Sequence, residues 1–409
     1  MRLAAILFVS TLQAADWISL RSPDVELFSD ASERTARQAL DHLGQLRELL
    51  GSAQPEPIPL RIVLFAKASE YRAYAPDATV AGFYQTGFDR DYILTSTGSG
   101  LARVVAHEYV HFLTNPRTTS RPTWLEEGLA EFYSTFDGKR VGAPIPEHLQ
   151  LLQRSTWLTA DEINAPRELT PTFYAQSWAL VHMLRREARF PERITTQNVT
   201  DLRQYIRNAR PSSVTISAVA TPAAVAEPVS PLNALLLRAD LALHSQHPQL
   251  AHTLYEQAAK EYPNSSGAAT GLATLAFAEG NRDGALKQLR HALDLNDRDA
   301  LAWFELGAME NDNAALENAA RWNPNLGEAH VLLGVRATDA GDLAAALRHL
   351  EQATNLMPRK SYAWYSLGYA QEKAGLHDAA ELSLRTALRA ATTTEQRQMA
   401  QTLLDSIEE

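Results

Sequence analysis

Hydrophobic residues recur with two different spacings along the first half of the chain. The segments Asp24–Asp30 and Pro59–Ala66 are short and rich in Val, Ile, Leu and Phe, which predicts β-strands. Between them, Glu33–Gly51 spaces its apolar residues three and four apart and closes on a glycine, which predicts a helix. A further strand is predicted over Arg90–Gly98, before a helical region. Residues 16–208 are therefore predicted to form an α+β domain.

Residues 209–231 follow neither spacing. The stretch reads ARPSSVTISAVATPAAVAEPVSP and is rich in Pro, Ala, Ser and Val. This composition predicts an extended linker that is partly stiffened by its prolines.

From Leu232 onward the chain repeats itself. Ala251 and Ala285 are 34 residues apart, and so are Ala346 and Ala380. Bulky apolar residues lie four positions after these alanines, and a second set of alanines lies seven positions after them. The other markers are the first-helix motifs AWFELG, AHVLLG and AWYSLG and the repeat-end prolines Pro263, Pro324 and Pro358.

This 34-residue pattern of Trp, Leu-Gly, two alanines and Pro resembles the tetratricopeptide (TPR) repeats. The resemblance predicts an all-α superhelical solenoid over residues 232–394, with four full repeats and one short one, and a capping helix over 395–409. Gly307 and Gly334 are only 27 residues apart, so the third repeat should have lost about two helical turns. Repeats of this kind imply a protein partner.

The N-terminal sequence MRLAAILFVSTLQAADW has one basic residue, a short apolar run and small residues before Asp16. This pattern predicts a signal peptide over residues 1–15 and an exported protein, periplasmic or extracellular, with no membrane span in the mature chain. The chain has no cysteine, which excludes disulfides and a lipidated N-terminal cysteine. The formal net charge of −10, with no basic stripe, argues against nucleic acid as a partner.

The helical region after the predicted strands carries two histidines four residues apart. His107 and His111 share one face of a helix, where two imidazoles can bind one Zn²⁺. Glu108 lies about 100° around the helix from His107 and could take a proton from a water that the metal activates. The motif H-E-x-x-H also occurs by chance in ordinary helices, so a third ligand is needed to support a zinc site.

Candidates for the third ligand lie in WLEEGLAEF, residues 124–132. Thr123-x-x-Glu126 matches a capping box, which would give Glu126 a role at the helix start and leave Glu127 to point elsewhere. Glu131 is four residues beyond Glu127 and therefore on the same face. It could accept the N–H of a ligand histidine, or it could be an ordinary solvated helix residue.

Together these segments resemble the gluzincin (peptidase MA-like) zinc metallopeptidases, in which H-E-x-x-H precedes a W-L-x-E-G-x-A helix. The resemblance covers about residues 24–190 and implies a zincin-like α+β fold with Zn²⁺ as cofactor. It implies His107, His111 and Glu127 as metal ligands and Glu108 as the general base. It also implies that Glu131 is the acid that accepts the N–H of a ligand histidine, and His107 is the expected partner.

In gluzincins a later helix commonly supplies a Tyr or His that stabilises the oxyanion. Tyr174, at the start of YAQSWALVHML, is the first candidate, against a packing role; His182 is the second, although a helix-surface position explains it equally well. The stretch Gly87–Gly98 should place an edge strand along the cleft, where it would pair with an extended substrate. The Gly-x-Met-Glu-Asn motif of the aminopeptidases is absent from the sequence.

The sequence therefore predicts an exported zinc metallopeptidase whose TPR domain recruits a peptide or protein substrate or another protein partner. The alternative is a TPR scaffold or adaptor whose peptidase-like domain is catalytically inactive. A third possibility is a zinc hydrolase that acts on a non-peptide amide.

Overall fold

The computed structural model describes residues 17–51, 59–77, 79–87, 90–98, 100–114, 121–185, 189–208, 211–216 and 224–408. The predicted signal peptide, residues 1–15, lies outside the described residues. Among the described residues, no helix is both long and apolar enough to cross a membrane.

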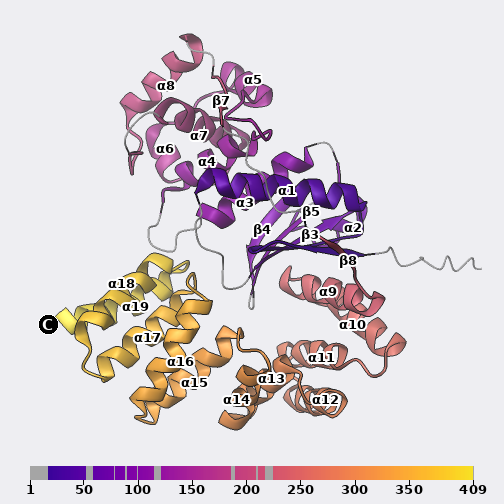
Figure 1. Cartoon of the computed structure of the whole chain (residues 1–409). Helices are drawn as coiled ribbons and strands as arrows, with labels where there is room; N and C mark the ends of the chain where they lie inside the picture. Colours follow the sequence, from indigo (N-terminus) through magenta and orange to yellow (C-terminus); the bar gives the residue numbers. More distant parts are fainter. Residues whose placement is uncertain are drawn as a thin grey trace, which may run out of the picture.

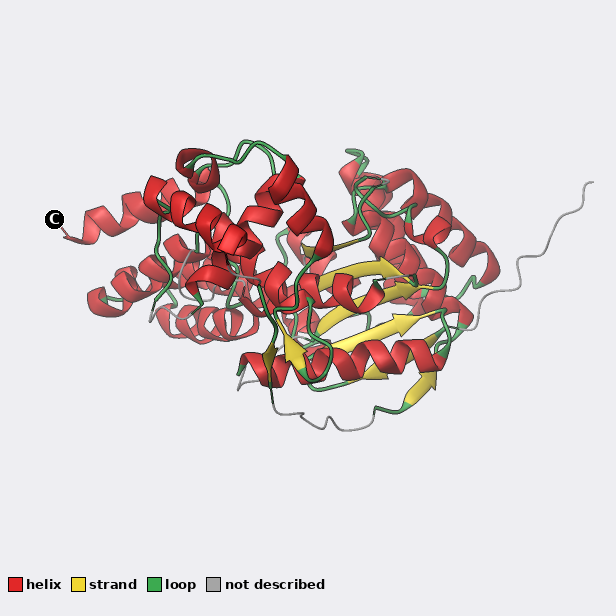
Figure 2. Cartoon of the chain, turned by 90° about the horizontal axis from the view of Figure 1, so that it is seen from above, coloured by secondary structure: helices red, strands yellow, loops and turns green. Residues whose placement is uncertain are grey.

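A six-stranded mixed sheet forms the centre of the N-terminal part (Figure 2). Its strands lie in the order β4-β5-β3-β2-β1-β8. The strands β2, β3 and β5 run parallel to one another, and the other pairs are antiparallel. The three strands predicted from the sequence are present as β2, β3 and β5. The bounds are β1 (Ile18–Arg21), β2 (Val25–Ser29), β3 (Leu60–Phe65), β4 (Gly82–Thr86), β5 (Asp91–Ser96) and β8 (Ala226–Pro228).

The edge of the sheet differs from the prediction. The strand expected at the edge from Gly87–Gly98 is β5, which lies inside the sheet between β4 and β3. The edge strand is β4, because the chain reverses after Thr86 and β5 pairs with both neighbours.

The predicted linker is also more ordered than its composition suggests. Within it, β7 (Val214–Thr215) pairs with β6 (Arg140–Val141), and β8 pairs with β1. Both short strands form backbone hydrogen bonds with the edge of an existing strand. Such pairing does not require alternating hydrophobic residues in the added strand. The linker is therefore attached to the α+β domain at two points.

Helices cover both faces of the sheet (Figure 1). Helix α1 (Glu33–Leu50) is capped by the Ser32 hydroxyl and ends at Gly51 with φ 67°, a left-handed conformation that favours glycine. Together with α3 (Leu101–Thr114), it packs against one face of the sheet.

The opposite face of the sheet packs against the first repeat. Along β3, Leu60 and Ile62 join the core formed with α1, whereas Val63 and Phe65 join a second core with α9 (Pro231–His244). This alternation follows from the two-residue period of a strand. The solenoid and the α+β domain therefore share a hydrophobic core.

The rest of the α+β domain is helical. Helices α4 and α7 pack closely, since a Cβ atom on Gly128 would clash with the backbone oxygen of Ser177. Trp124 and Trp178 are fully buried in the same core. The bounds of these helices are α2 (Ala68–Tyr71), α4 (Thr123–Ser134), α5 (Pro146–Arg154), α6 (Ala160–Asn164), α7 (Pro171–Leu184) and α8 (Thr196–Asn208).

The C-terminal part is an all-helical solenoid. Helices α13 and α14 have 11 and 10 residues, whereas α11 and α12 have 13 and 14, so the shortening of the third repeat is shared between its two helices. The bounds after α9 are α10 (Pro248–Glu261), α11 (Ser266–Ala278), α12 (Arg282–Leu295), α13 (Ala300–Glu310), α14 (Asn313–Trp322), α15 (Gly327–Asp339), α16 (Leu343–Leu356), α17 (Ser361–Lys373), α18 (His377–Ala390) and α19 (Thr394–Glu408).

The solenoid curves back toward the α+β domain, as the arc of helices in Figure 1 shows. In the loop between α16 and α17, Arg359 lies 3.2 Å from the Asp91 carboxylate, and Lys360 Nζ donates to the Gly87 carbonyl at 2.7 Å. The Arg359 guanidinium also lies 4.3 Å from the centre of the Phe112 ring on α3. The solenoid thus contacts the α+β domain both through α9 and through this later loop.

Candidate metal centre

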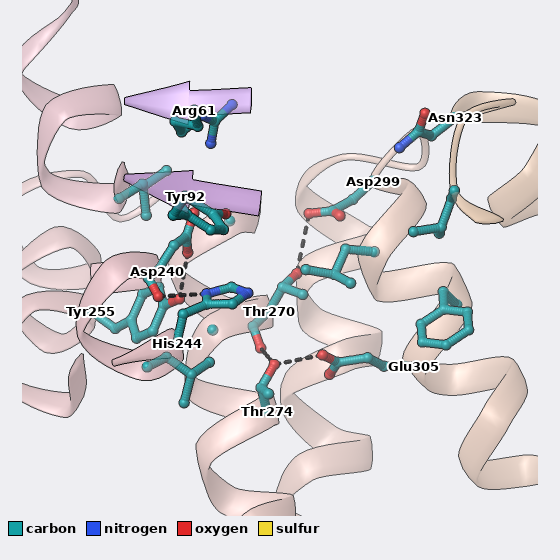
Figure 3. Close-up of a pocket in the computed structure, with 17 residues that line it drawn as sticks. Arg61, Tyr92, Asp240, His244, Tyr255, Thr270, Thr274, Asp299, Glu305 and Asn323 are labelled. Carbon is teal, nitrogen blue, oxygen red and sulfur yellow. Dashed lines mark hydrogen bonds between the residues drawn. The ribbon is translucent and has the colours of Figure 1, made fainter. Parts of the chain in front are cut away.

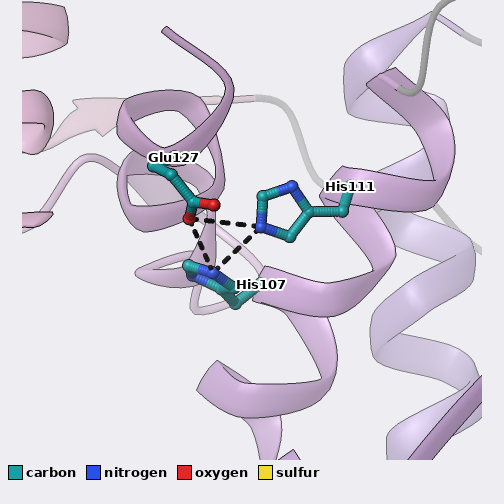
Figure 4. A group of neighbouring side chains, drawn as sticks. All are labelled: His107, His111 and Glu127. Atoms are coloured by element: carbon teal, nitrogen blue, oxygen red, sulfur yellow. Dashed lines mark hydrogen bonds and ion pairs between the residues drawn. The ribbon is translucent and has the colours of Figure 1, made fainter. Parts of the chain in front are cut away.

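The candidate metal centre lies between helices α3 and α4 (Figure 4). The Nε2 atoms of His107 and His111 are 3.1 Å apart, because one helical turn stacks the two imidazoles. The Oε2 atom of Glu127 lies 3.5 Å from His107 Nε2 and 3.3 Å from His111 Nε2. These are the only three His, Asp or Glu side chains of the described residues whose ligand atoms converge in this way.

This triangle fits a zinc ion. Zinc bonds His nitrogen and carboxylate oxygen at about 2.0–2.2 Å in tetrahedral geometry, which places neighbouring ligand atoms about 3.3 Å apart. Two histidines and one glutamate also match the donor set of catalytic zinc sites, which keep a fourth position open. Burial opposes ionisation of Glu127, but both histidines outweigh it and lower the pKa of Glu127 to about 2.

Glu131 lies behind His107. Its Oε1 is 3.6 Å from His107 Nδ1, the ring nitrogen that faces away from the triangle. Its Oε2 contacts His148 Nε2 at 3.2 Å and accepts a hydrogen bond from Arg103 at 2.8 Å. Burial is outweighed by His148, His107 and Arg103, which together lower the pKa of Glu131 to about 2. Glu131 is itself buried, which removes the alternative of a solvated helix residue.

Sequence reasoning did not identify His148 or Arg103. His148 lies on α5, and Arg103 lies one turn before His107 on α3. Neither belongs to a motif with fixed spacing. His148 reaches Glu131 because α5 and α4 both pack against α7.

Glu108 connects the site to the sheet. Its Oε2 accepts the backbone N–H of Tyr84, on edge strand β4, at 2.9 Å. Burial raises the pKa of Glu108, although the two histidines and the Tyr84 N–H oppose this shift. The side chain of Tyr84 donates to Asp91 at 2.6 Å, which ties β4 to β5 at the same place.

Tyr174 lies next to the histidines, with its ring centre 6.4 Å from that of His107. It stands in the first turn of α7, which Thr170 caps through its hydroxyl and which has Pro171 at the first helical position. Burial, and then the acids Glu127, Glu108 and Glu131, raise the pKa of Tyr174 to about 12. The phenol is therefore neutral and able to donate a hydrogen bond near pH 7.

His182 is a buried packing residue, so the prediction of a helix-surface position is wrong. It is buried, and its ring contacts Phe132 and Trp178 edge-on, with ring centres 4.9 and 4.8 Å away. Arg185 NH1 lies 2.8 Å from its Nδ1. Burial and Arg185 lower the pKa of His182 to about 4.

The capping box predicted for α4 is wrong. Helix α4 begins at Thr123, and Pro122, whose side chain has no hydrogen-bond acceptor, is its N-cap. Glu126 therefore stands in the fourth helical position, beyond the reach of a capping bond, and burial raises its pKa. What distinguishes Glu127 is that its carboxylate faces both histidines.

Comparison with known proteins supports the assignment of the C-terminal region. Two family models described as tetratricopeptide repeat match residues 242–309 and 331–393. The interval between the matches contains α14, the second helix of the short third repeat. No curated protein matches the chain.

Several solved structures are similar to this chain. MamA is 23% identical, covering 37% of this chain and 93% of its own, with a TM-score of 0.31. A thermophilic TPR protein of Thermus thermophilus is 20% identical, covering 43% and 98%, with a TM-score of 0.34. The pilF protein of Pseudomonas aeruginosa is 16% identical, covering 43% and 88%, with a TM-score of 0.37. The family models identify the C-terminal solenoid as tetratricopeptide repeats.

Proposed function

We propose that this chain is a TPR scaffold that binds a protein partner and carries a zinc-dependent peptidase centre in its α+β domain. TPR repeats imply partner binding. The observation that carries the catalytic part is the convergence of His107 Nε2, His111 Nε2 and Glu127 Oε2, each within 3.5 Å of the other two.

The residues around this triangle suit peptide hydrolysis. A Zn²⁺ held by His107, His111 and Glu127 would supply a Lewis acid and activate water near neutral pH. Glu108 is buried beside the triangle, and its raised pKa suits a base that accepts a proton and passes it to the leaving amine. The neutral phenol of Tyr174 would donate to the developing oxyanion.

Strand β4 offers a place for the substrate backbone. The Tyr84 N–H that bonds Glu108 lies on the side of β4 away from β5, so Glu108 stands beside the free edge of the sheet. A peptide that pairs with this edge would run past Glu108 in an extended conformation.

The second candidate is a TPR scaffold whose α+β domain is inactive. It is favoured by the family matches, which fall within the repeats and not on the residues of the metal centre. Both candidates include a protein partner, and they differ in whether the centre binds zinc and cleaves.

The test combines metal content with cleavage. The purified chain, the Glu108→Gln variant and the His111→Ala variant are analysed for zinc by mass spectrometry and incubated with a peptide library. Of these three proteins, we expect stoichiometric zinc in the first two, loss of zinc in His111→Ala, and cleavage only by the unaltered chain. Glu126→Gln serves as the matched control, since Glu126 neighbours Glu127 but lies outside the triangle. Cleavage by Glu108→Gln would refute the mechanism, and a folded protein without zinc would favour the inactive scaffold.

We also propose export by the signal peptide over residues 1–15. N-terminal sequencing of protein recovered from the producing cells checks this, and an intact Met1 on exported or retained protein would contradict it.

A further inference from the structure

A cavity of about 540 Å³ lies between the sheet and the inner helices of the first three repeats (Figure 3). Its volume falls in the range of about 300–1,000 Å³ that ligand pockets occupy. Strands β3 and β5 contribute Arg61 and Tyr92, and helices α9, α11 and α13 form the opposite wall. Leu236, Leu243 and Phe304 make much of that wall apolar.

Three carboxylates point into this cavity from the repeats. Each accepts a hydrogen bond from a hydroxyl group of the wall, which holds its orientation (Figure 3). The pairs are Tyr255 to Asp240 at 2.5 Å, Thr270 to Asp299 at 3.1 Å, and Thr274 to Glu305 at 2.5 Å.

Arg61, the only arginine among the described residues that line the cavity, does not balance these acids. Arg61 donates to Glu26 at 3.0 Å and lies over the Phe28 ring at 5.0 Å, so its charge is already paired outside the cavity. His244 bonds the Asp240 carbonyl through Nδ1 at 2.7 Å. The electrostatic potential of the cavity is therefore set mainly by the three carboxylates.

Glu305 has one carboxylate oxygen whose hydrogen bonding is not satisfied within the part of the chain that the structure describes. Its Oε1 accepts from Thr274, while its Oε2 is buried and has no hydrogen-bond partner among the described residues. Burial raises the pKa of Glu305 to about 7; the Thr274 hydrogen bond opposes this shift, and the nearby Asp299 adds to it. An unpaired buried acceptor is destabilising, and a cationic donor placed in the cavity would satisfy it.

We propose that this cavity receives a lysine or arginine side chain of the protein partner, with the cationic group bonded to Glu305. The aliphatic part of that side chain packs against Leu236 and Phe304, as long basic side chains do on apolar surfaces. The inference rests on the proposed partner binding and adds the chemistry that selects the partner. It is independent of whether the metal centre is active.

The test uses a random-peptide display library and full-length protein that carries Glu108→Gln, so that peptides are not cleaved. We expect the selected peptides to be enriched in Lys or Arg at one position. A selected peptide is then compared with its acetyl-lysine version by fluorescence anisotropy. Acetylation, or the additional change Glu305→Gln, should weaken binding about tenfold, because either removes a charge-assisted bond. Glu317→Gln on the exposed face of α14 is the control and should leave binding unchanged.

The outcomes separate this inference from the proposed function. Selected peptides without a basic preference, or equal affinity after Glu305→Gln, overturn the cavity assignment but leave partner binding intact. Selection of no peptide counts against both. An unchanged melting temperature of Glu305→Gln shows that any loss of binding is local, since the amide can still accept from Thr274.

Discussion

Arg359 provides a direct test of the contact between the solenoid and the sheet edge. The side chains of Arg359 and Asp91 are only 11% and 14% exposed, and the guanidinium also lies over Phe112. Truncating one member of a buried ion pair costs about 3–5 kcal/mol, and an exposed pair about 0–1 kcal/mol. Asp91 keeps its bond from Tyr84, so Arg359→Met should cost about 2–3 kcal/mol.

Local opening is the quantity to measure, because a chain with repeats is not expected to unfold in one step. Hydrogen exchange with mass spectrometry on peptides that cover β4 and β5 gives the opening free energy of this hairpin. We expect Arg359→Met to lower that free energy by about 2–3 kcal/mol and to leave the exchange of α11 and α12 unchanged. The Met side chain keeps most of the apolar contact of the arginine, so the effect reports the charge.

Arg290 supplies the matched control, since its pair with Glu310 is exposed and lies far from β4 in the sequence. Arg290→Met should leave β4 and β5 unchanged. If Arg359→Met also leaves their exchange unchanged, the contact does not hold the hairpin in solution. A double-mutant cycle with Asp91→Asn then checks the pairing, because a coupling energy near zero would show that the two side chains act independently.

Three further predictions concern the α+β domain. Gly128→Ala should lower the free energy of unfolding by about 1–3 kcal/mol, because the added Cβ would press on the Ser177 carbonyl. The change is measured as a lower melting temperature. An unchanged melting temperature would show that α4 and α7 can separate freely. Glu131→Gln should weaken zinc binding about 10- to 100-fold in a chelator competition, and equal affinity would mean that Glu131 does not orient His107. The pKa of His182 falls from 6.5 in the unfolded chain to about 4 in the fold, so the unfolded state takes up the proton first as the pH falls. His182 should therefore lower the unfolding free energy by about 3 kcal/mol as the pH falls from 7 to 4. Urea titrations at these two pH values measure this loss, and the His182→Gln variant should not show it.

The elements that the sequence predicted well carry a repeating local pattern. The strands β2, β3 and β5 show concentrated β-branched and aromatic residues, and the 34-residue period placed the alanines of the solenoid. Ala251, Ala285 and Ala346 are all completely buried, as positions of close helix contact require. The spacing of H-E-x-x-H also predicts that its two histidines share one face of a helix, because residues four apart in a helix lie on the same side.

The features that the sequence did not predict depend on distant parts of the chain. Strand β8 forms because β1 offers an unpaired edge, and nothing within residues 209–231 encodes that edge. The helix start at Thr123 was missed because a proline can precede a helix without capping it through a side chain. His148 joins Glu131 only through the packing of helices, which no local spacing reports.

The shared core changes how the two parts of the chain should be regarded. Composition predicts an extended, proline-stiffened linker between separate domains, yet the sheet buries Val63, Phe65 and Tyr92 against the first repeat. Residues 16–208 alone would expose this apolar face to water, and each large side chain uncovered would cost about 1.5–3 kcal/mol. The first repeat is thus a structural layer of the α+β domain. The cavity around Glu305 lies at that same junction, so it exists only when both parts fold together.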